Sequence, residues 1–214
     1  MHDHDDFAFD PIPGLPGIPP KGEEILWQGK PHALTLARQA FAVNWVAGYF
    51  ALLVIWRVGV SSTSYPMAEA IGHGVPFLIL GVLSCAILTF FAWVQSRATI
   101  YTITTHRVAI KMGAALQMTL NLPFTQVNNA NFALNKNGTG TIALELKQED
   151  AKLSYLMTWP HVRPWRMANP EPALRCIPEA AKIASLLAQA AETRVSDTSS
   201  IRVSAPDALP TPAE

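Results

Sequence analysis

Two long apolar runs dominate the pattern of hydrophobic and polar positions along the chain. Residues 41–56 and residues 75–94 contain no charged side chain, whereas the segments around them carry ordinary polar mixtures. With its flanks, each run reaches the roughly twenty residues that a helix needs to cross about 30 Å of hydrocarbon. The pattern therefore predicts transmembrane helices at residues 41–60 and 75–95, joined by a periplasmic loop at residues 61–74.

The periodicity changes to two beyond Arg97, where apolar and polar residues alternate. Such alternation is typical of half-buried antiparallel strands, and Asn137-Gly138 is a type I′ hairpin signal within this region. The stretches that we expect to form strands are residues 99–104, 107–112, 116–122, 142–146 and 153–159.

A final helix is expected to begin at Pro178, because proline is favoured at the first helical position. The residues that would then lie on one apolar stripe are Ala180, Ile183, Leu187 and Ala190. Short strands closed by one amphipathic helix make a curved antiparallel sheet or partial barrel, whose open end the helix fills. We therefore predict a membrane α-helical hairpin plus a β-rich domain over residues 97–192.

The remaining segments are polar or rich in proline. Residues 1–22, with adjacent histidines and aspartates before a proline and glycine series, are expected to form a flexible tail without a metal site. Residues 193–214 are rich in serine, threonine and proline, and we expect them to be disordered. Residues 23–40 lead to the membrane, and their short apolar core suits either a strand or an interfacial anchor.

A few polar or small residues interrupt the apolar runs. Asn44 either makes an interhelical hydrogen bond or lies at the level of the lipid headgroups, and we favour the second. Gly81, Ser84 and Cys85 fall near one helical face. They either pack against the first helix or simply fill space, and the sequence leaves both readings open.

Basic residues near the helix ends predict the orientation of the hairpin. Those outside the two runs are Lys30, Arg38, Arg97, Arg107 and Lys111, against Arg57 alone in the connecting loop. Because basic flanks remain on the cytoplasmic side, we expect a multi-pass inner-membrane protein with both termini in the cytoplasm.

Composition excludes several classes of function. Only 15% of the residues are charged, against about 25% in ordinary soluble proteins, and the net charge is zero, so a nucleic-acid partner is not expected. The histidines fall in different segments and assemble no ligand set or nucleophile and base pair, so we expect neither an enzyme nor a cofactor. Cys85 and Cys176 lie in different compartments, which argues against a disulfide.

The most unusual soluble segment is WPHVRPWRM at residues 159–167. Its prolines make it rigid, and its aromatic and cationic side chains are of the kinds enriched in binding hot spots. An equally weighted reading is an internal clasp of stacked arginine and tryptophan that fastens the sheet to the last helix, and both readings can hold together. The candidate partner-binding residues are Trp159, His161, Arg163, Trp165 and Arg166.

The order of these parts resembles bacterial membrane proteins that carry a pleckstrin-homology-like domain. The sequences PPKGEEILWQGKP, AWVQSRATIYTITTHRVAIKMGAALQMTLNLPF, GTGTIAL and LSYLMTWPHVRPWRMANPEPALRCIP are similar, more narrowly, to the PuhB-like photosynthetic complex assembly proteins of purple bacteria. Those proteins are encoded near the reaction-centre H subunit. The similarity extends over roughly residues 7–190.

The resemblance implies an assembly factor for the photosynthetic reaction centre and its light-harvesting core complex, in the inner or intracytoplasmic membrane. Reaction-centre subunits, the H subunit first among them, and membrane lipids are the expected partners, and a homodimer is a further option. The alternative is a protein that binds lipid or bacteriochlorophyll, with His161 or His73 as the magnesium ligand. A phosphoinositide pocket is not expected, because its turn offers only His106, Arg107 and Lys111.

Overall fold

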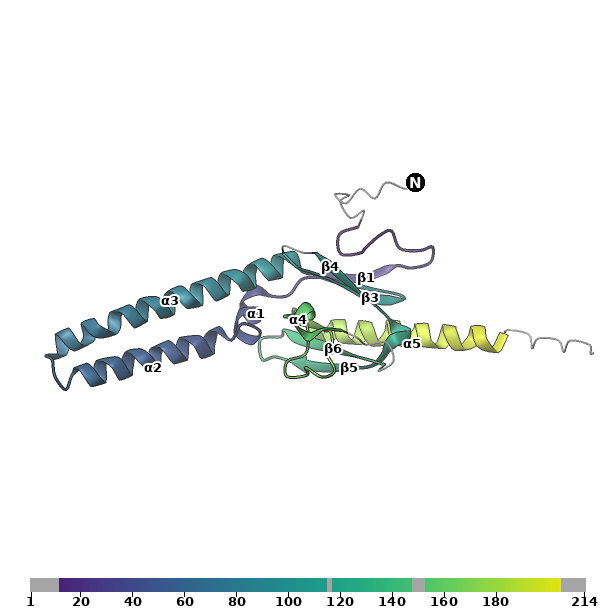
Figure 1. Cartoon of the computed structure of the whole chain (residues 1–214). Coiled ribbons are helices and arrows are strands. Elements are labelled where there is room, and N and C mark those ends of the chain that lie inside the picture. Colours follow the sequence, from purple (N-terminus) through teal and green to yellow (C-terminus); the bar gives the residue numbers. More distant parts are fainter. Residues whose placement is uncertain (1–11, 115–116, 148–152, 205–214) are drawn as a thin grey trace, which may run out of the picture.

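The computed structural model describes residues 12–114, 117–147 and 153–204. A long helical hairpin forms one end of the molecule and a β-rich domain the other, with the last helix running outward beyond the sheets (Figure 1). The histidine and aspartate cluster near the N-terminus and the chain after residue 204 lie outside the described residues.

Helices α2 (Val43–Ser61) and α3 (Met67–Ala98) form the hairpin. Both are long and apolar enough to cross a membrane. Their large side chains point outward into open space, as at Trp45 and Ile55, which are 82% and 69% exposed. A continuous apolar surface of this kind is rare in soluble proteins and suits contact with lipid. Most of the predicted loop at residues 61–74 is helical, because α3 begins at Met67.

Small residues set the close approach of the two hairpin helices. A Cβ atom added at Gly81 would lie 2.7 Å from Cβ of Phe50, so only glycine fits there. The Cys85 side chain also faces α2, with its Sγ 4.0 Å from the Val43 carbonyl oxygen. Of the two readings for the small residues, packing against the first helix is therefore correct at Gly81 and Cys85. Asn44 is exposed in the first turn of α2, a position that fits the headgroup level.

Two antiparallel sheets build the β-rich domain within the described residues. The first has the order β1-β2-β3-β4 and the second the order β5-β6-β7. The strands are β1 (Ile25–Gly29), β2 (Ile100–Thr104), β3 (Arg107–Met112), β4 (Met118–Pro123), β5 (Val127–Leu134), β6 (Gly140–Leu146) and β7 (Ala173–Ile177). The shorter helical elements are α1 (Ala33–Gln39), η1 (Phe124–Gln126) and α4 (Tyr155–Thr158).

The helical hairpin is inserted between two neighbouring strands of one sheet. Strand β1 precedes the hairpin and β2 follows it, yet they pair in antiparallel register, with Gln28 opposite Thr102. Residues 23–40 therefore contribute a strand rather than only an anchor. The β-rich domain is built from both sides of the hairpin and does not begin at residue 97.

The core lies between the sheets and the last helix, α5 (Ala180–Ser204). The stripe predicted for this helix faces inward, since Ala180, Ile183, Leu187 and Ala190 are all at most 7% exposed. They join Tyr101, Ile103, Val108 and Ile110 in the hydrophobic core. The predicted fold, an apolar helical hairpin with a curved β-rich domain closed by a C-terminal helix, is confirmed.

Several local expectations differ from the structure. Residues 153–159 contain the helical turn α4 instead of a strand, and neither β5 nor β7 was predicted. Helix α5 starts after Pro178, at Ala180, and continues to Ser204, through a stretch expected to be disordered. In the N-terminal segment expected to be a flexible tail, Leu15 is fully buried.

Candidate partner-binding site

The segment between α4 and β7 contains all five candidate residues, and its backbone is held at both ends. It opens with a cis peptide bond between Trp159 and Pro160. The His161 amide donates to the Thr158 carbonyl at 2.8 Å, and the Ala173 amide donates to the His161 carbonyl at 2.9 Å. The segment therefore begins as an extension of the sheet, next to β7.

His161 forms the centre of a buried polar network. Its Nε2 lies 2.9 Å from Thr99 Oγ1, and its Nδ1 lies 2.7 Å from the Tyr101 hydroxyl oxygen. That hydroxyl also accepts a hydrogen bond from the Arg175 amide at 3.1 Å. The contacts fit a neutral imidazole that accepts from Tyr101 at Nδ1 and donates to Thr99 at Nε2. Because Tyr101 belongs to β2 and Arg175 to β7, the network connects the two sheets.

Burial and the neighbouring Arg175 guanidinium keep His161 neutral. Removal from water, and then repulsion by Arg175, lower the pKa of His161 from 6.5 to about 3. Burial also raises the pKa of Tyr101 above its usual value. Since His161 is fully buried and both its ring nitrogens are engaged, it is a structural residue. Its prediction as a partner-binding residue is wrong, and it is not placed to bind magnesium.

The two arginines of the segment converge on one buried carboxylate. Arg163 Nη1 lies 2.9 Å from Glu171 Oε2, and Arg166 Nη1 lies 3.4 Å from Glu171 Oε1. The Glu171 side chain is only 4% exposed, whereas the arginines are 38% and 53% exposed. The arginines thus fold the segment back onto the residues before β7 and keep part of their surface in solvent.

The tryptophans have different surroundings. The Trp159 ring packs edge-on against Phe41, with ring centroids 5.0 Å apart, and so joins the domain to the chain just before α2. Trp165 is 90% exposed and has a positive φ of 65°. Further large apolar side chains that are exposed here are Leu156 and Met157 of α4 and Met167 of the segment after it. The predicted clasp of stacked arginine and tryptophan is not found in the described part of this segment, because both arginines pair with Glu171 and Trp159 contacts Phe41 rather than α5. His161 and Trp159 make internal contacts of another kind, and Trp165 is exposed.

Further contacts join the hairpin to the domain. Cys176 Sγ donates to Gln39 Oε1 at 3.3 Å, and the His32 amide donates to the Cys176 carbonyl at 2.8 Å. Burial raises the pKa of Cys176 to about 11, so its thiol stays protonated. Ser96 of α3 donates to the Pro31 carbonyl at 2.5 Å. Strand β7, α1 and α3 are thus connected, which orients the domain relative to the hairpin.

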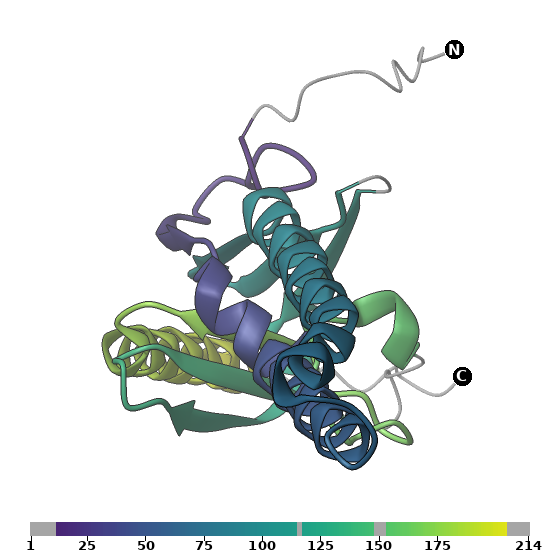
Figure 2. The same cartoon turned by 90° about the vertical axis from the view of Figure 1, so that its left-hand side faces the viewer.

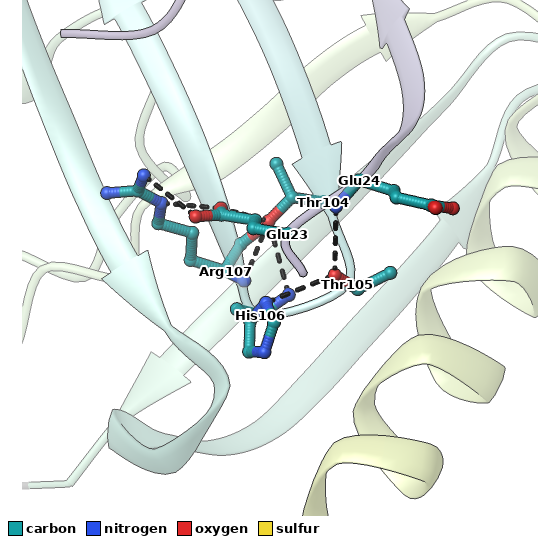
Figure 3. A network of polar contacts seen from close by, with 6 residues as sticks. All are labelled: Glu23, Glu24, Thr104, Thr105, His106 and Arg107. Atoms are coloured by element: carbon teal, nitrogen blue, oxygen red, sulfur yellow. Dashed lines mark hydrogen bonds and ion pairs between the residues drawn. The ribbon is translucent and has the colours of Figure 1, made fainter. Parts of the chain in front are cut away.

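A second polar network fastens β1 to the turn between β2 and β3 (Figure 3). Arg107 donates to both carboxylate oxygens of Glu23, at 2.8 and 3.0 Å, and Thr104 donates to the same carboxylate at 2.7 Å. Burial alone would raise the pKa of Glu23, but the bonds from Arg107 and Thr104 outweigh it and hold the pKa below its usual value. Because Glu23 neutralises Arg107, this turn is poorly suited to bind an anionic headgroup.

Comparisons with known proteins agree with this architecture. The chain is 42% identical over 204 residues to a protein of Rhodobacter capsulatus described as an uncharacterized 23.7 kDa protein in the puhA 5′ region. The alignment covers 92% of each chain. No solved structure matches. The family profile of the bacterial PH domain matches residues 40–191, most of the hairpin and domain described above, and the chain therefore belongs to the bacterial PH domain family.

Proposed function

We propose that this protein is a membrane-anchored assembly factor for the photosynthetic reaction centre and its light-harvesting core complex, and that it acts by binding protein subunits. The observation that carries the proposal is the 42% identity to a protein of the puhA 5′ region, since puhA encodes the reaction-centre H subunit. On this proposal the chain is a PuhB-like protein, and the H subunit is its first expected partner.

The hairpin would place the domain at the cytoplasmic membrane surface. Two helices that are both long and apolar enough to span a bilayer return the chain to the side on which it started. The predominance of basic residues outside the hairpin supports a cytoplasmic location for both termini. Confinement to the membrane raises the effective concentration of the domain near nascent subunits, so a modest affinity suffices.

The exposed part of the 155–167 segment is the surface that we propose for partner recognition. The contact of Trp159 with Phe41 places this segment next to the start of α2. Figures 1 and 2 show α4 on the side of the domain that faces the hairpin. Trp165 projects from backbone that is fixed on the side of His161, so it loses little entropy when a partner covers it.

Complementation of a strain that lacks this protein tests the proposal. The double change Trp165→Ala and Arg166→Ala should leave the protein abundant and folded but reduce the reaction-centre and core-antenna absorbance of the cells. Lys182→Ala, at an exposed position of α5, is the matched surface control and should restore normal absorbance. Normal absorbance with a folded double variant would sink the assignment of this surface, and normal absorbance in the deletion strain would sink the proposed function.

Pigment binding is a second candidate, supported by a single residue of the hairpin. His73 of α3 has a buried Nδ1 with no hydrogen-bond partner among the described residues, and its ring contacts Tyr65 at 5.0 Å between centroids. A pigment carrier purified from photosynthetic membranes should show a bacteriochlorophyll absorption band that disappears in His73→Phe. A colourless preparation would contradict this second candidate.

A further inference from the structure

Strand β5 forms an open edge of its sheet. It pairs with β6 and with no second strand among the described residues, and it runs along the margin of the domain (Figure 1). At the end of this strand, the Asn135 amide donates to the Thr139 carbonyl on the β6 side. The amide and carbonyl groups of successive residues in a strand point alternately to its two sides. Since those of Asn135 point toward β6, those of Phe132 and Leu134 point away from β6, toward the open edge.

This edge lacks the usual protection against pairing with another chain. Sheets commonly shield an edge with lysine, proline or an inward charge, and the sequence of β5, VNNANFAL, contains none of these. A bulge interrupts the register only between Val127 and Asn129, far from the exposed amides. Phe132 and Leu134 are 44% and 58% exposed. An uncharged edge of this length without such protection is suited to pairing with a further strand.

A hollow of about 230 Å³ lies between the same strand and α5. Ala130 and Phe132 line it from β5, so it opens on the face to which alternate side chains of this strand point. The helix contributes small side chains that leave the space unfilled, namely Ala184, Ala188 and Ala191. A cavity of about 150 Å³ can hold benzene, so this hollow has room for one bulky apolar side chain.

We propose that the β5 edge and this hollow bind an extended segment of a partner protein, which adds a strand to the sheet. The main chain of the segment would pair with Phe132 and Leu134. Its alternate side chains would lie on the same face as Ala130 and Phe132, and one bulky apolar side chain would enter the hollow. Main-chain hydrogen bonds then supply affinity, and the hollow supplies specificity.

The position of the edge indicates where the partner segment comes from. The turn after β5 is bound to α1, since Gln39 donates to Asn135 Oδ1 at 2.7 Å and Asn137 donates to Thr35 Oγ1 at 3.1 Å. Helix α1 leads directly into α2, so the Leu134 end of the edge lies near the start of the hairpin. Resting on the proposed function, the occupant is an uncharged, extended segment next to a transmembrane helix of a membrane subunit.

The test uses the full chain in detergent micelles and a fluorescein-labelled peptide, Thr-Val-Thr-Phe-Thr-Val-Thr. Two further peptides carry N-methyl groups, one on the amides of phenylalanine and the valines, the other on the threonine amides. Only one edge of an added strand faces β5, so one methylated peptide should bind like the parent and the other at least about tenfold more weakly. In hydrogen exchange, the parent peptide should slow the Phe132 and Leu134 amides.

Two variants of α5 test the hollow. Ala188→Trp fills it and should weaken binding of the parent peptide by about tenfold or more, whereas Lys182→Trp, on the same helix but outside the hollow, should not. A thermal melt of each variant shows that it is folded. The methylated peptides keep the test decisive if Ala188→Trp does not fold, because they need no change in the protein.

Several results would overturn the inference. Two of them are equal binding of both methylated peptides and no binding of the parent peptide. Protection of the edge amides by higher protein concentration alone would assign the edge to a second copy of the chain, and protection by lipid nanodiscs without peptide would assign it to the membrane. If peptides bind as expected but a deletion strain assembles normal complexes, the proposed function is wrong and the binding site at the β5 edge is supported. If the deletion strain assembles fewer complexes but the peptides do not bind, the proposed function is supported and the binding site is wrong.

Discussion

Lowering the pH is expected to destabilise the β-rich domain through His161. Because burial and Arg175 lower the folded-state pKa from 6.5 to about 3, protonation favours the unfolded chain. The stabilisation is complete above pH 6.5 and is lost as the pH falls from 6.5 toward 3. Between pH 8 and pH 5, this one group should reduce the free energy of unfolding by about 2 kcal/mol.

Urea unfolding of the full chain in detergent micelles, followed by tryptophan fluorescence, measures this loss. The control is His161→Asn, which removes the titrating group but keeps a polar side chain. It should be about 1–3 kcal/mol less stable than the parent protein at pH 8, because hydrogen bonds of Thr99 and Tyr101 are lost. Between pH 8 and pH 5, the free energy of unfolding of His161→Asn should fall by about 2 kcal/mol less than that of the parent protein.

The pH window isolates His161 from Glu23. The pKa of Glu23 is lowered, so its contribution is present above the ordinary value of 4.5 and is lost only as the pH falls below it. If the parent protein and His161→Asn lost the same free energy between pH 8 and pH 5, the buried neutral imidazole would not be responsible, and the reasoning would be refuted.

Three further perturbations test the rest of the fold. Gly81→Leu should destabilise the hairpin by about 1–3 kcal/mol and lower its melting temperature in detergent, whereas Gly48→Leu, with open space beside it, should not. Equal melting temperatures of the two variants would contradict the packing of α2 against α3. Glu23→Gln should cost about 1–3 kcal/mol in urea unfolding by breaking a charge-assisted pair, and the exposed Glu24→Gln is its control, so equal losses would count against the network. A cysteine replacing Ser62 should react with an impermeant reagent in intact cells, and protection of that cysteine would invert the proposed topology.

The hairpin and most strands could be predicted because their signals are local. A helix that faces lipid shows an uninterrupted apolar run, and a half-buried strand such as β3 alternates. Strand β5, with the sequence VNNANFAL, was missed because adjacent asparagines interrupt its alternation. Strand β7 was missed because all five of its residues are buried, so it has no alternation to detect. Residues 153–159 were expected to form a strand, yet residues 155–158 form a helical turn, since so short a stretch does not determine the backbone.

The candidate site could be predicted only as a segment, not residue by residue. Whether His161 faces outward or inward depends on Thr99 and Tyr101, which lie about sixty residues earlier in the chain. Such long-range hydrogen bonds leave no periodic trace in the sequence. The exposure of Trp165 depends in the same way on how Arg163 and Arg166 fold the segment onto Glu171. The open edge of β5 is a property of strand order, which the sequence pattern does not specify.

An assembly factor differs from a permanent subunit in when it binds. The most direct measurement is therefore the amount of this protein that co-purifies with the reaction-centre H subunit at intervals after a purple bacterium is shifted to photosynthetic growth. We expect association to rise while complexes are being built and to fall once they are mature. Absence of association throughout assembly, or a constant stoichiometric amount in mature complexes, would contradict a role as an assembly factor.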